Sequence, residues 1–218
     1  MISIRNISAN AGSFILKDHS PLHCSMAQDG VELLSIKTAL ARYGDLPDYW
    51  WKAVHPGTDK YTAQAALALD DGYFIRVQAG VKAAFPVQAC LFIGAEGISQ
   101  NIHNVVIAEA GSELHIITGC TTAPDLHRGL HVGVSEFFVQ KGATVTSTML
   151  HNWGDEIVVR PRTSVIVEEG ATFMSNYVCL KSSRSVQMDP LVRLVGANAV
   201  TRLNTILVAA QGADFDIR

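Results

Sequence analysis

Val105-Val106-Ile107-Ala108-Glu109-Ala110-Gly111-Ser112 is the first clear copy of a unit that this sequence repeats. Further copies are Phe137-Phe138-Val139-Gln140-Lys141-Gly142-Ala143 and Val165-Ile166-Val167-Glu168-Glu169-Gly170-Ala171, and a weaker one is Leu194-Val195-Gly196-Ala197-Asn198. Each clear copy has an apolar run, then polar residues, then a glycine. The turn glycines are Gly80, Gly111, Gly142, Gly170 and Gly196. Successive glycines are 31, 31, 28 and 26 residues apart.

This spacing predicts a mainly β fold, a β-solenoid. Each repeat has the length of one coil of two or three short strands and their turns, and the spacing is more regular than an arbitrary sandwich requires. The apolar residues are expected to pack on the coils above and below, and glycine allows a left-handed backbone at the corner. An antiparallel sandwich or small barrel stays open as the alternative. The strands are expected at residues 73–77, 89–93, 105–108, 114–118, 137–139, 145–149, 158–159, 165–167, 173–178, 192–195 and 205–209.

The first third of the chain has a different periodicity. Over residues 31–43, apolar residues recur at three- and four-residue spacing, which predicts a helix that stops at Gly44. Shorter helices are expected at residues 48–54 and at residues 59–69, the latter capped by Asp59. We therefore predict a mostly helical N-terminal region over residues 1–71 and a β core over residues 72–218.

The composition excludes several classes of protein. The chain has 218 residues, a formal net charge of −3 and no dense Lys/Arg segment, so a nucleic-acid or acidic-membrane partner is not expected. Its first residues lack the pattern of a signal peptide and no apolar run is long enough to span a membrane, which predicts a cytoplasmic protein. Only 17% of the residues are charged, so part of the surface is expected to be covered by a partner.

Reactive side chains are densest between residues 115 and 153. His127 and His131 are four apart, which places both on one face of a strand, where they are candidates to share a metal ion. His115 and Cys120 are expected on opposite faces unless Gly119 ends the strand. The four cysteines form no CxxC pair, so neither a structural zinc site nor a disulfide framework is expected; they are Cys24, Cys90, Cys120 and Cys179.

Each candidate also has a purely structural interpretation. A histidine beside an apolar stripe, such as His115 or His151, is usually a hydrogen-bonded core residue, and a free cysteine usually packs as a small hydrophobe. Cys120 differs, because a glycine and Pro124 bracket its segment; we expect an exposed turn thiol there, with the environment of a reactive thiolate. The nucleotide-binding, zinc-protease and serine-hydrolase motifs are missing from the sequence.

The segment from His115 to Trp153 resembles the core of the SufB/SufD family. The resemblance rests on the Gly119-Cys120-Thr121-Thr122-Ala123-Pro124 turn, on Leu130-His131-Val132-Gly133-Val134-Ser135-Glu136 and on Met149-Leu150-His151-Asn152-Trp153, at matching distances within matching repeats. It implies a right-handed parallel β-helix scaffold that assembles iron–sulfur clusters with a SufC-like ABC-type ATPase, and it runs from about residue 30 onward. The implied partners also include a cysteine desulfurase system and a second SufB/SufD-like subunit, in a homodimer or heterodimer.

The resemblance also implies site residues. Cys120 occupies the position regarded in SufB as the entry point for sulfur, and a protonated His115 would favour its thiolate. His151 and Trp153 match positions that line the route for sulfur through the helix interior. Cys179 is a further candidate for that route or for a transient iron–sulfur cluster, for which His115, His127, His131 and His151 are further candidate ligands.

Two departures from the family qualify this picture. Leu91-Phe92-Ile93-Gly94 stands where SufB has Phe-Arg-Ile-Asn, so two polar residues of the route are missing. The later coils and ATPase-docking helices of the family are also absent, so the chain is expected to lack the C-terminal part. We therefore expect an assembly scaffold rather than a turnover enzyme. The alternatives are a structural β-solenoid interaction module without its own chemistry, and a metal enzyme that uses His127, His131 and His151.

Overall fold

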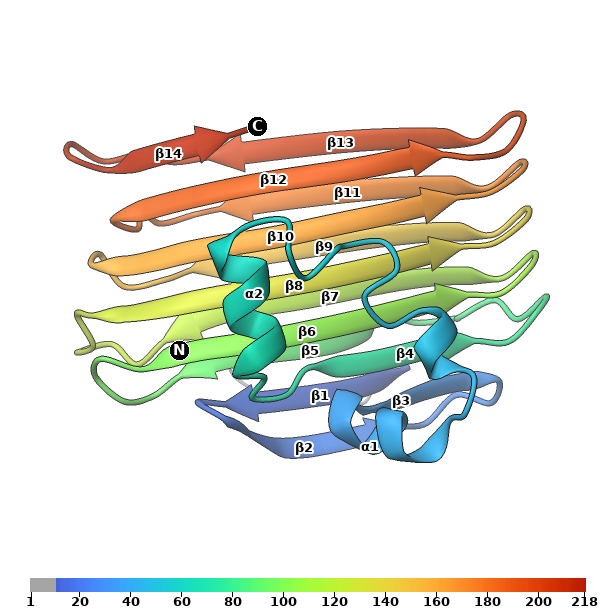
Figure 1. Ribbon diagram of the computed structural model, residues 1–218, viewed down its shortest axis with the longest axis horizontal. Coiled ribbons are helices and arrows are strands. Elements are labelled where there is room, and N and C mark those ends of the chain that lie inside the picture. Colours follow the sequence, from blue (N-terminus) through green and yellow to red (C-terminus); the bar gives the residue numbers. More distant parts are fainter. Residues whose placement is uncertain (1–10) are drawn as a thin grey trace.

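The chain forms a parallel β-solenoid of about five turns, preceded by a short helical region. The computed structural model describes residues 11–218. Two seven-stranded sheets face each other (Figure 1). Sheet I has the order β13-β11-β9-β7-β5-β1-β2, and sheet II has the order β14-β12-β10-β8-β6-β4-β3. The strands are β1 (Gly12–Lys17), β2 (Ser20–Met26), β3 (Val31–Ser35), β4 (Tyr73–Val77), β5 (Val87–Ile93), β6 (Ser99–Ala108), β7 (Glu113–Thr122), β8 (Gly129–Val139), β9 (Thr144–Asn152), β10 (Ile157–Val167), β11 (Thr172–Cys179), β12 (Ser185–Leu194), β13 (Val200–Leu207) and β14 (Asp214–Ile217).

Successive coils stack in register, which confirms the predicted solenoid. Each strand from β4 to β12 pairs in parallel with the strand two further along the chain, so equivalent residues of neighbouring coils lie side by side. Thr118, Met149 and Tyr177, for example, are direct partners across β7, β9 and β11. Side chains of alternate residues therefore form columns inside the solenoid, and the apolar columns make its main core.

The chain makes a left-handed turn at the corner after each strand of sheet II from β4 to β12, and the fifth turn of this series differs from the prediction. Gly142 and Gly170 have φ angles of 68° and 64°, as the repeat requires. In the next coil the residue with positive φ is Asn198, at 57°, and not Gly196. The amide of Gly170 donates to the carbonyl of Ala197 as that of Gly142 donates to Glu169, so the true turn series ends at Asn198. Gly196 is instead pressed against the backbone of Glu169, where a Cβ atom would not fit.

The N-terminal region is less helical than predicted. Residues 31–35 are strand β3, because they pair with β4, and the helix α1 (Ile36–Arg42) starts only after Ser35, whose hydroxyl accepts a hydrogen bond from the amide of Thr38. The helix expected at residues 48–54 is absent; only the 3₁₀ turn η2 (Leu46–Asp48) precedes that segment. The helix α2 (Lys60–Leu67), with Asp59 as its N-cap, confirms the third prediction. Strands β1 and β2 also precede these helices.

The helical segments lie on the outer face of sheet II and not on sheet I (Figure 1). One apolar cluster beneath them joins Ile36, Ala39 and Leu46 to Phe74, Val105 and Phe138. A second joins Val54 and Ala65 to Val132 and Val134. Within residues 11–218, no helix has the length and apolarity to cross a membrane. Residues 1–10, on which part of the cytoplasmic prediction rests, lie outside the described residues.

Candidate functional site in the solenoid interior

A column of reactive side chains runs through three coils inside the solenoid. Cys120 of β7 is the register partner of His151 of β9, and His151 is the partner of Cys179 of β11. All three are buried, with at most 2% of each residue exposed. Neighbouring strands are about 4.8 Å apart, so this column places a thiol on each side of one imidazole.

Cys120 is not the exposed turn thiol that the sequence predicts. Strand β7 continues through Gly119, which pairs with Cys90 and Leu150, and ends only at Thr122. The Cys120 side chain therefore points into the interior. Burial, and secondarily the nearby Cys90, raises the pKa of the Cys120 thiol well above its ordinary value, so the resting group is a protonated thiol.

His115 cannot support a thiolate at Cys120. The alternation along β7 places His115 on the outer face of sheet I, opposite to the side of Cys120. Its Nε2 atom lies 3.1 Å from the hydroxyl of Thr148. Burial lowers the pKa of His115, which favours the neutral ring. The predicted assistance from a protonated His115 is therefore wrong.

His151 and Trp153 supply the polar atoms of the interior. Nδ1 of His151 shares a 2.8 Å hydrogen bond with the hydroxyl of Tyr177, whereas its Nε2 atom has no partner among the described residues. The indole nitrogen of Trp153, a fully buried residue, also has no partner there, and the two rings are 5.6 Å apart. Burial, with a smaller contribution from His131, lowers the pKa of His151 to about 3, so this ring is neutral.

His131 belongs to the same interior group, but His127 does not. The ring of His131 lies 4.8 Å from Trp153, its Nδ1 atom lies 2.9 Å from the side-chain oxygen of Gln100, and burial lowers its pKa to about 3. His127 is exposed in the corner between β7 and β8, so the prediction that the two histidines share a ligand is wrong. In the described part of the chain, no three His, Cys, Asp or Glu side chains converge on a metal position. The three histidines of the alternative metal site are not together, because His127 is exposed whereas His131 and His151 are buried.

Residues 91–218 match the family model described as SUF system FeS cluster assembly, SufBD core domain, and this match covers more than half of the chain. The chain belongs to the SufBD family. It is 45% identical over 211 residues to an iron–sulfur cluster assembly SufBD family protein of Methanothermobacter thermautotrophicus (strain Winter), with 95% of this chain and 52% of that protein aligned. A SufBD family protein of Archaeoglobus fulgidus is 42% identical, over 96% of this chain and 56% of its own length.

The relation extends to bacterial SufB. The iron–sulfur cluster assembly protein SufB of Bacillus subtilis is 28% identical over 144 residues, which are 66% of this chain and 31% of SufB. The chain thus spans about half the length of its archaeal SufBD relatives. Within it, the three positions that carried the resemblance, Cys120, His151 and Trp153, all face the interior of the SufBD core.

A cavity of about 250 Å³ adjoins the interior group of Cys120, His151 and Trp153, on the side of the last coils. Tyr177, which is bonded to His151, lies in its wall. Small hydroxyl residues stack beside it on both sheets and leave the space open, namely Ser135 and Thr163 on sheet II and Ser147 and Ser175 on sheet I.

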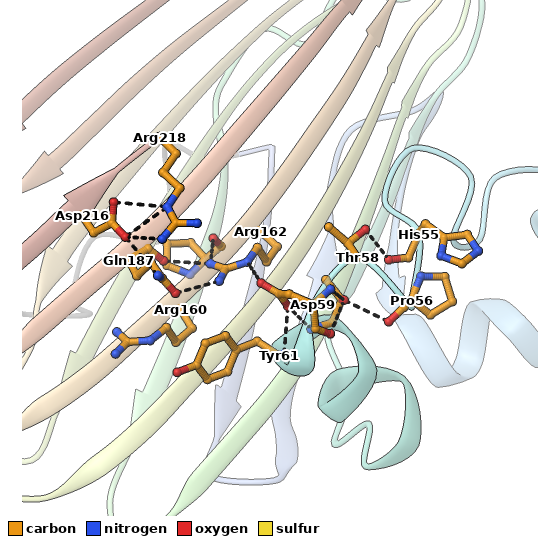
Figure 2. Close-up of polar contacts among 12 residues, drawn as sticks. His55, Pro56, Thr58, Asp59, Tyr61, Arg160, Arg162, Gln187, Asp216 and Arg218 are labelled. Carbon is orange, nitrogen blue, oxygen red and sulfur yellow. Dashed lines mark hydrogen bonds and ion pairs between the residues drawn. The ribbon is translucent and has the colours of Figure 1, made fainter.

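A second cavity, of about 340 Å³, lies between the start of α2 and the strands β10 and β12. Figure 2 shows that Asp59, Arg162 and Gln187 in its wall are bonded to one another. Nε of Arg162 lies 2.7 Å from the Asp59 carboxylate, and its other nitrogens donate to backbone and side-chain oxygens of Gln187. The ring of Tyr61 lies 5.3 Å from the guanidinium carbons of both Arg160 and Arg162. We interpret this network as the attachment of α2 to the SufBD core.

The sequence analysis missed the most enclosed ionisable pair. His103 of β6 and Glu136 of β8 have fully buried side chains, and they lie between sheet II and the segment that contains Trp50 and Trp51. The available signal was Glu136 itself, the single acidic residue of strand β8. His103 gave no signal, because its partners come from segments distant in the sequence.

Proposed function

We propose that this chain accepts sulfur at Cys120 during iron–sulfur cluster assembly. The observation that carries the proposal is the column Cys120, His151 and Cys179 in the interior of a SufBD core. In the reaction, the Cys120 thiolate attacks the outer sulfur of a persulfide on the donor protein. The donor's S–S bond breaks, its cysteine leaves as a thiolate that takes up the proton lost by Cys120, and Cys120 becomes the persulfide.

The interior supplies hydrogen-bond donors for that persulfide. When the hydroxyl of Tyr177 donates to Nδ1 of His151, Nε2 of His151 carries a hydrogen. This N–H group and the indole N–H of Trp153 are both buried and both lack an acceptor among the described residues. An anionic persulfide is a better acceptor than the thiol it replaces, so these two donors favour the sulfur-loaded state.

Access to Cys120 requires movement of the adjacent corner. Strand β7 ends two residues after Cys120, and Pro124 and Asp125 in the following turn are exposed. We propose that this corner opens when the sulfur donor binds, because the resting thiol is closed to solvent. The burial of Cys120 also favours the second candidate function, a structural β-solenoid module whose cysteine only packs.

The proposed role also includes a class of protein, a sulfur donor, partners and a cargo. We assign the chain as a scaffold, with a cysteine desulfurase system as sulfur donor, an ABC-type ATPase as partner and the iron–sulfur cluster as transient cargo. All four cysteines are free thiols, which supports a reducing compartment such as the cytoplasm. A second SufB/SufD-like subunit, in a homodimer or heterodimer, is a further proposed partner.

The test is anaerobic intact-mass measurement after incubation with a persulfide-charged cysteine desulfurase. We expect one added sulfur atom on the wild type and none on Cys120→Ser, whereas Cys90→Ser, the matched change on the outer face of sheet I, still accepts sulfur. His151→Gln is expected to load more slowly, because it changes the donor next to Cys120. Equal loading of wild type and Cys120→Ser, or no loading of either, would exclude Cys120 as the sulfur acceptor and support the structural module.

A further inference from the structure

The corner next to Cys120 is closed by one apolar side chain. Residues 123–128 form this corner, between β7 and β8, and they stack on residues 94–98, the corner between β5 and β6 (Figure 1). Of residues 123–128, only Leu126 is buried, with 6% of the residue exposed, and it belongs to the same apolar cluster as Cys120 and Trp153. Movement of Leu126 out of this cluster would therefore open the end of the interior in which Cys120 lies.

A single carboxylate of the neighbouring corner holds the residues that follow Leu126. The backbone amide of His127 donates to Oε2 of Glu96 at 2.9 Å, and Nε of Arg128 lies 3.3 Å from Oε1 of the same carboxylate. The hydrogen bond from His127, and to a smaller extent the contacts with Arg128, lower the pKa of Glu96, so this carboxylate is charged at neutral pH.

Among the described residues, Glu96 is the one polar attachment of the middle of this corner to another coil. At both ends, the corner keeps the regular backbone bonding between coils. Residues 124–127 add two hydrogen bonds: the Leu126 amide donates to the Ala123 carbonyl, within the corner, and the His127 amide donates to Glu96. The bond to Glu96 therefore has to break before Leu126 can move away from the interior.

We propose that Glu96 is a latch that keeps Cys120 closed to solvent until a sulfur donor docks on this corner. The inference rests on the proposed sulfur acceptance at Cys120 and adds the residue that regulates access to it. The contacts of Glu96 with His127 and Arg128 hold the chain directly after Leu126, so Leu126 stays in the apolar cluster. The Glu96 side chain is 46% exposed, so a docking protein can reach the carboxylate and compete for its oxygens without unfolding a coil.

Alkylation of Cys120 by iodoacetamide, followed by peptide mass spectrometry, tests the latch without a sulfur donor. We expect Glu96→Ala to raise the rate at Cys120 about tenfold over the wild type, the effect of losing one hydrogen bond to a charged group. Cys179 is the internal control for global unfolding, because it is fully buried in the same column but lies beside a different corner. The matched variant is Glu156→Ala, which removes a similarly exposed ion pair with Arg184 between the next two corners and should leave Cys120 slow. An unchanged rate at Cys120 in Glu96→Ala, or an equal rise in Glu156→Ala or at Cys179, overturns the proposal.

Hydrogen exchange of the His127 amide, measured by NMR, tests whether the latch is formed in the resting protein. The reference is the amide of Asp125 in the same corner, which has no hydrogen-bond acceptor within residues 11–218. After correction for intrinsic rates, we expect His127 to exchange at least about tenfold more slowly than Asp125 in the wild type, and at a similar rate in Glu96→Ala. Equal exchange of the two amides in the wild type would show that Glu96 does not hold the corner.

Failure of the latch and failure of the proposed function give different results. If Cys120 accepts sulfur without a latch, wild type and Glu96→Ala are alkylated at the same rate, but the intact mass still shows sulfur added at Cys120. If the latch exists and Cys120 does not accept sulfur, Glu96→Ala speeds alkylation of Cys120 and the intact mass shows no added sulfur there.

Discussion

Nε2 of His103 lies 2.7 Å from Oε1 of Glu136, and neither side chain is exposed to solvent. The Glu136 carboxylate also accepts hydrogen bonds from the backbone amides of Trp51, Ala53 and Val54, at 2.7, 2.5 and 2.9 Å. Trp50 stacks on the His103 ring at 3.9 Å. Burial lowers the pKa of His103 although Glu136 opposes this, so a neutral ring donates to the carboxylate. The Glu136 carboxylate thus holds residues 51–54 against sheet II through hydrogen bonds.

Glu136→Gln is expected to destabilise the fold by about 3 kcal/mol, because the amide nitrogen cannot accept the backbone hydrogen bonds that the carboxylate accepts. The measurement is the free energy of unfolding in urea. Glu169→Gln is the control, since Glu169 forms an exposed ion pair with Lys141 and should cost less than about 1 kcal/mol. Equal losses for the two variants would show that Glu136 is not a structural tie.

The free energy of unfolding should decrease as the pH is lowered, because of the buried histidines. The folded-state pKa of His151 is about 3, below the ordinary value of 6.5, so the unfolded chain binds the proton more readily. The contribution of neutral His151 to the free energy of unfolding is complete above pH 6.5. It is lost as the pH falls toward 3, by about 1.4 kcal/mol per pH unit. Unfolding free energies between pH 6 and 4.5 should therefore depend less on pH in His151→Gln than in the wild type. Unchanged pH dependence would contradict the lowered pKa.

The Cys120 thiol is expected to resist alkylation in the resting protein. Burial raises the pKa of both Cys120 and Cys24, and that of Cys120 is raised well above its ordinary value. Cys120 is also closed to solvent, whereas Cys24 is exposed on β2. Iodoacetamide should modify Cys120 at least about tenfold more slowly than Cys24, as followed by peptide mass spectrometry. Similar rates at the two sites would mean that the corner after β7 is already open without a sulfur donor.

Two substitutions test the assignment of the turn series. Gly170→Ala places a Cβ atom at a φ of 64° and should cost about 1 kcal/mol, whereas Asn198→Gly, at 57°, should be neutral or stabilising. Thermal unfolding of both variants measures the difference. If Asn198→Gly destabilises as much as Gly170→Ala, Asn198 is not the fifth turn residue.

The solenoid itself was predictable from the sequence, because a repeated unit describes contacts that recur from coil to coil. The apolar runs before Gly111, Gly142 and Gly170 specify strands, inward side chains and corners without reference to distant residues. The N-cap of α2 was predictable for the same reason, since Asp59 bonds to amides only two and three residues away.

The local fold around the candidate site depended on tertiary contacts. Residues 31–35 have a helical spacing of apolar residues, but they form a strand because β4 offers an open edge. Gly119 looks like a turn residue, but it remains in a strand because the coils on both sides hold its register. Cys120 therefore became a buried thiol beside His151 rather than an exposed one.

The sequence by itself determined the repeat, and with it the parallel coils and the membership of Cys120, His151 and Trp153 in one segment. Only the tertiary structure decided which of the reactive side chains face the interior, which histidines lie apart and that His103 meets Glu136. The physical reason is that strand register and burial arise from pairing between coils about 30 residues apart, which local spacing does not encode.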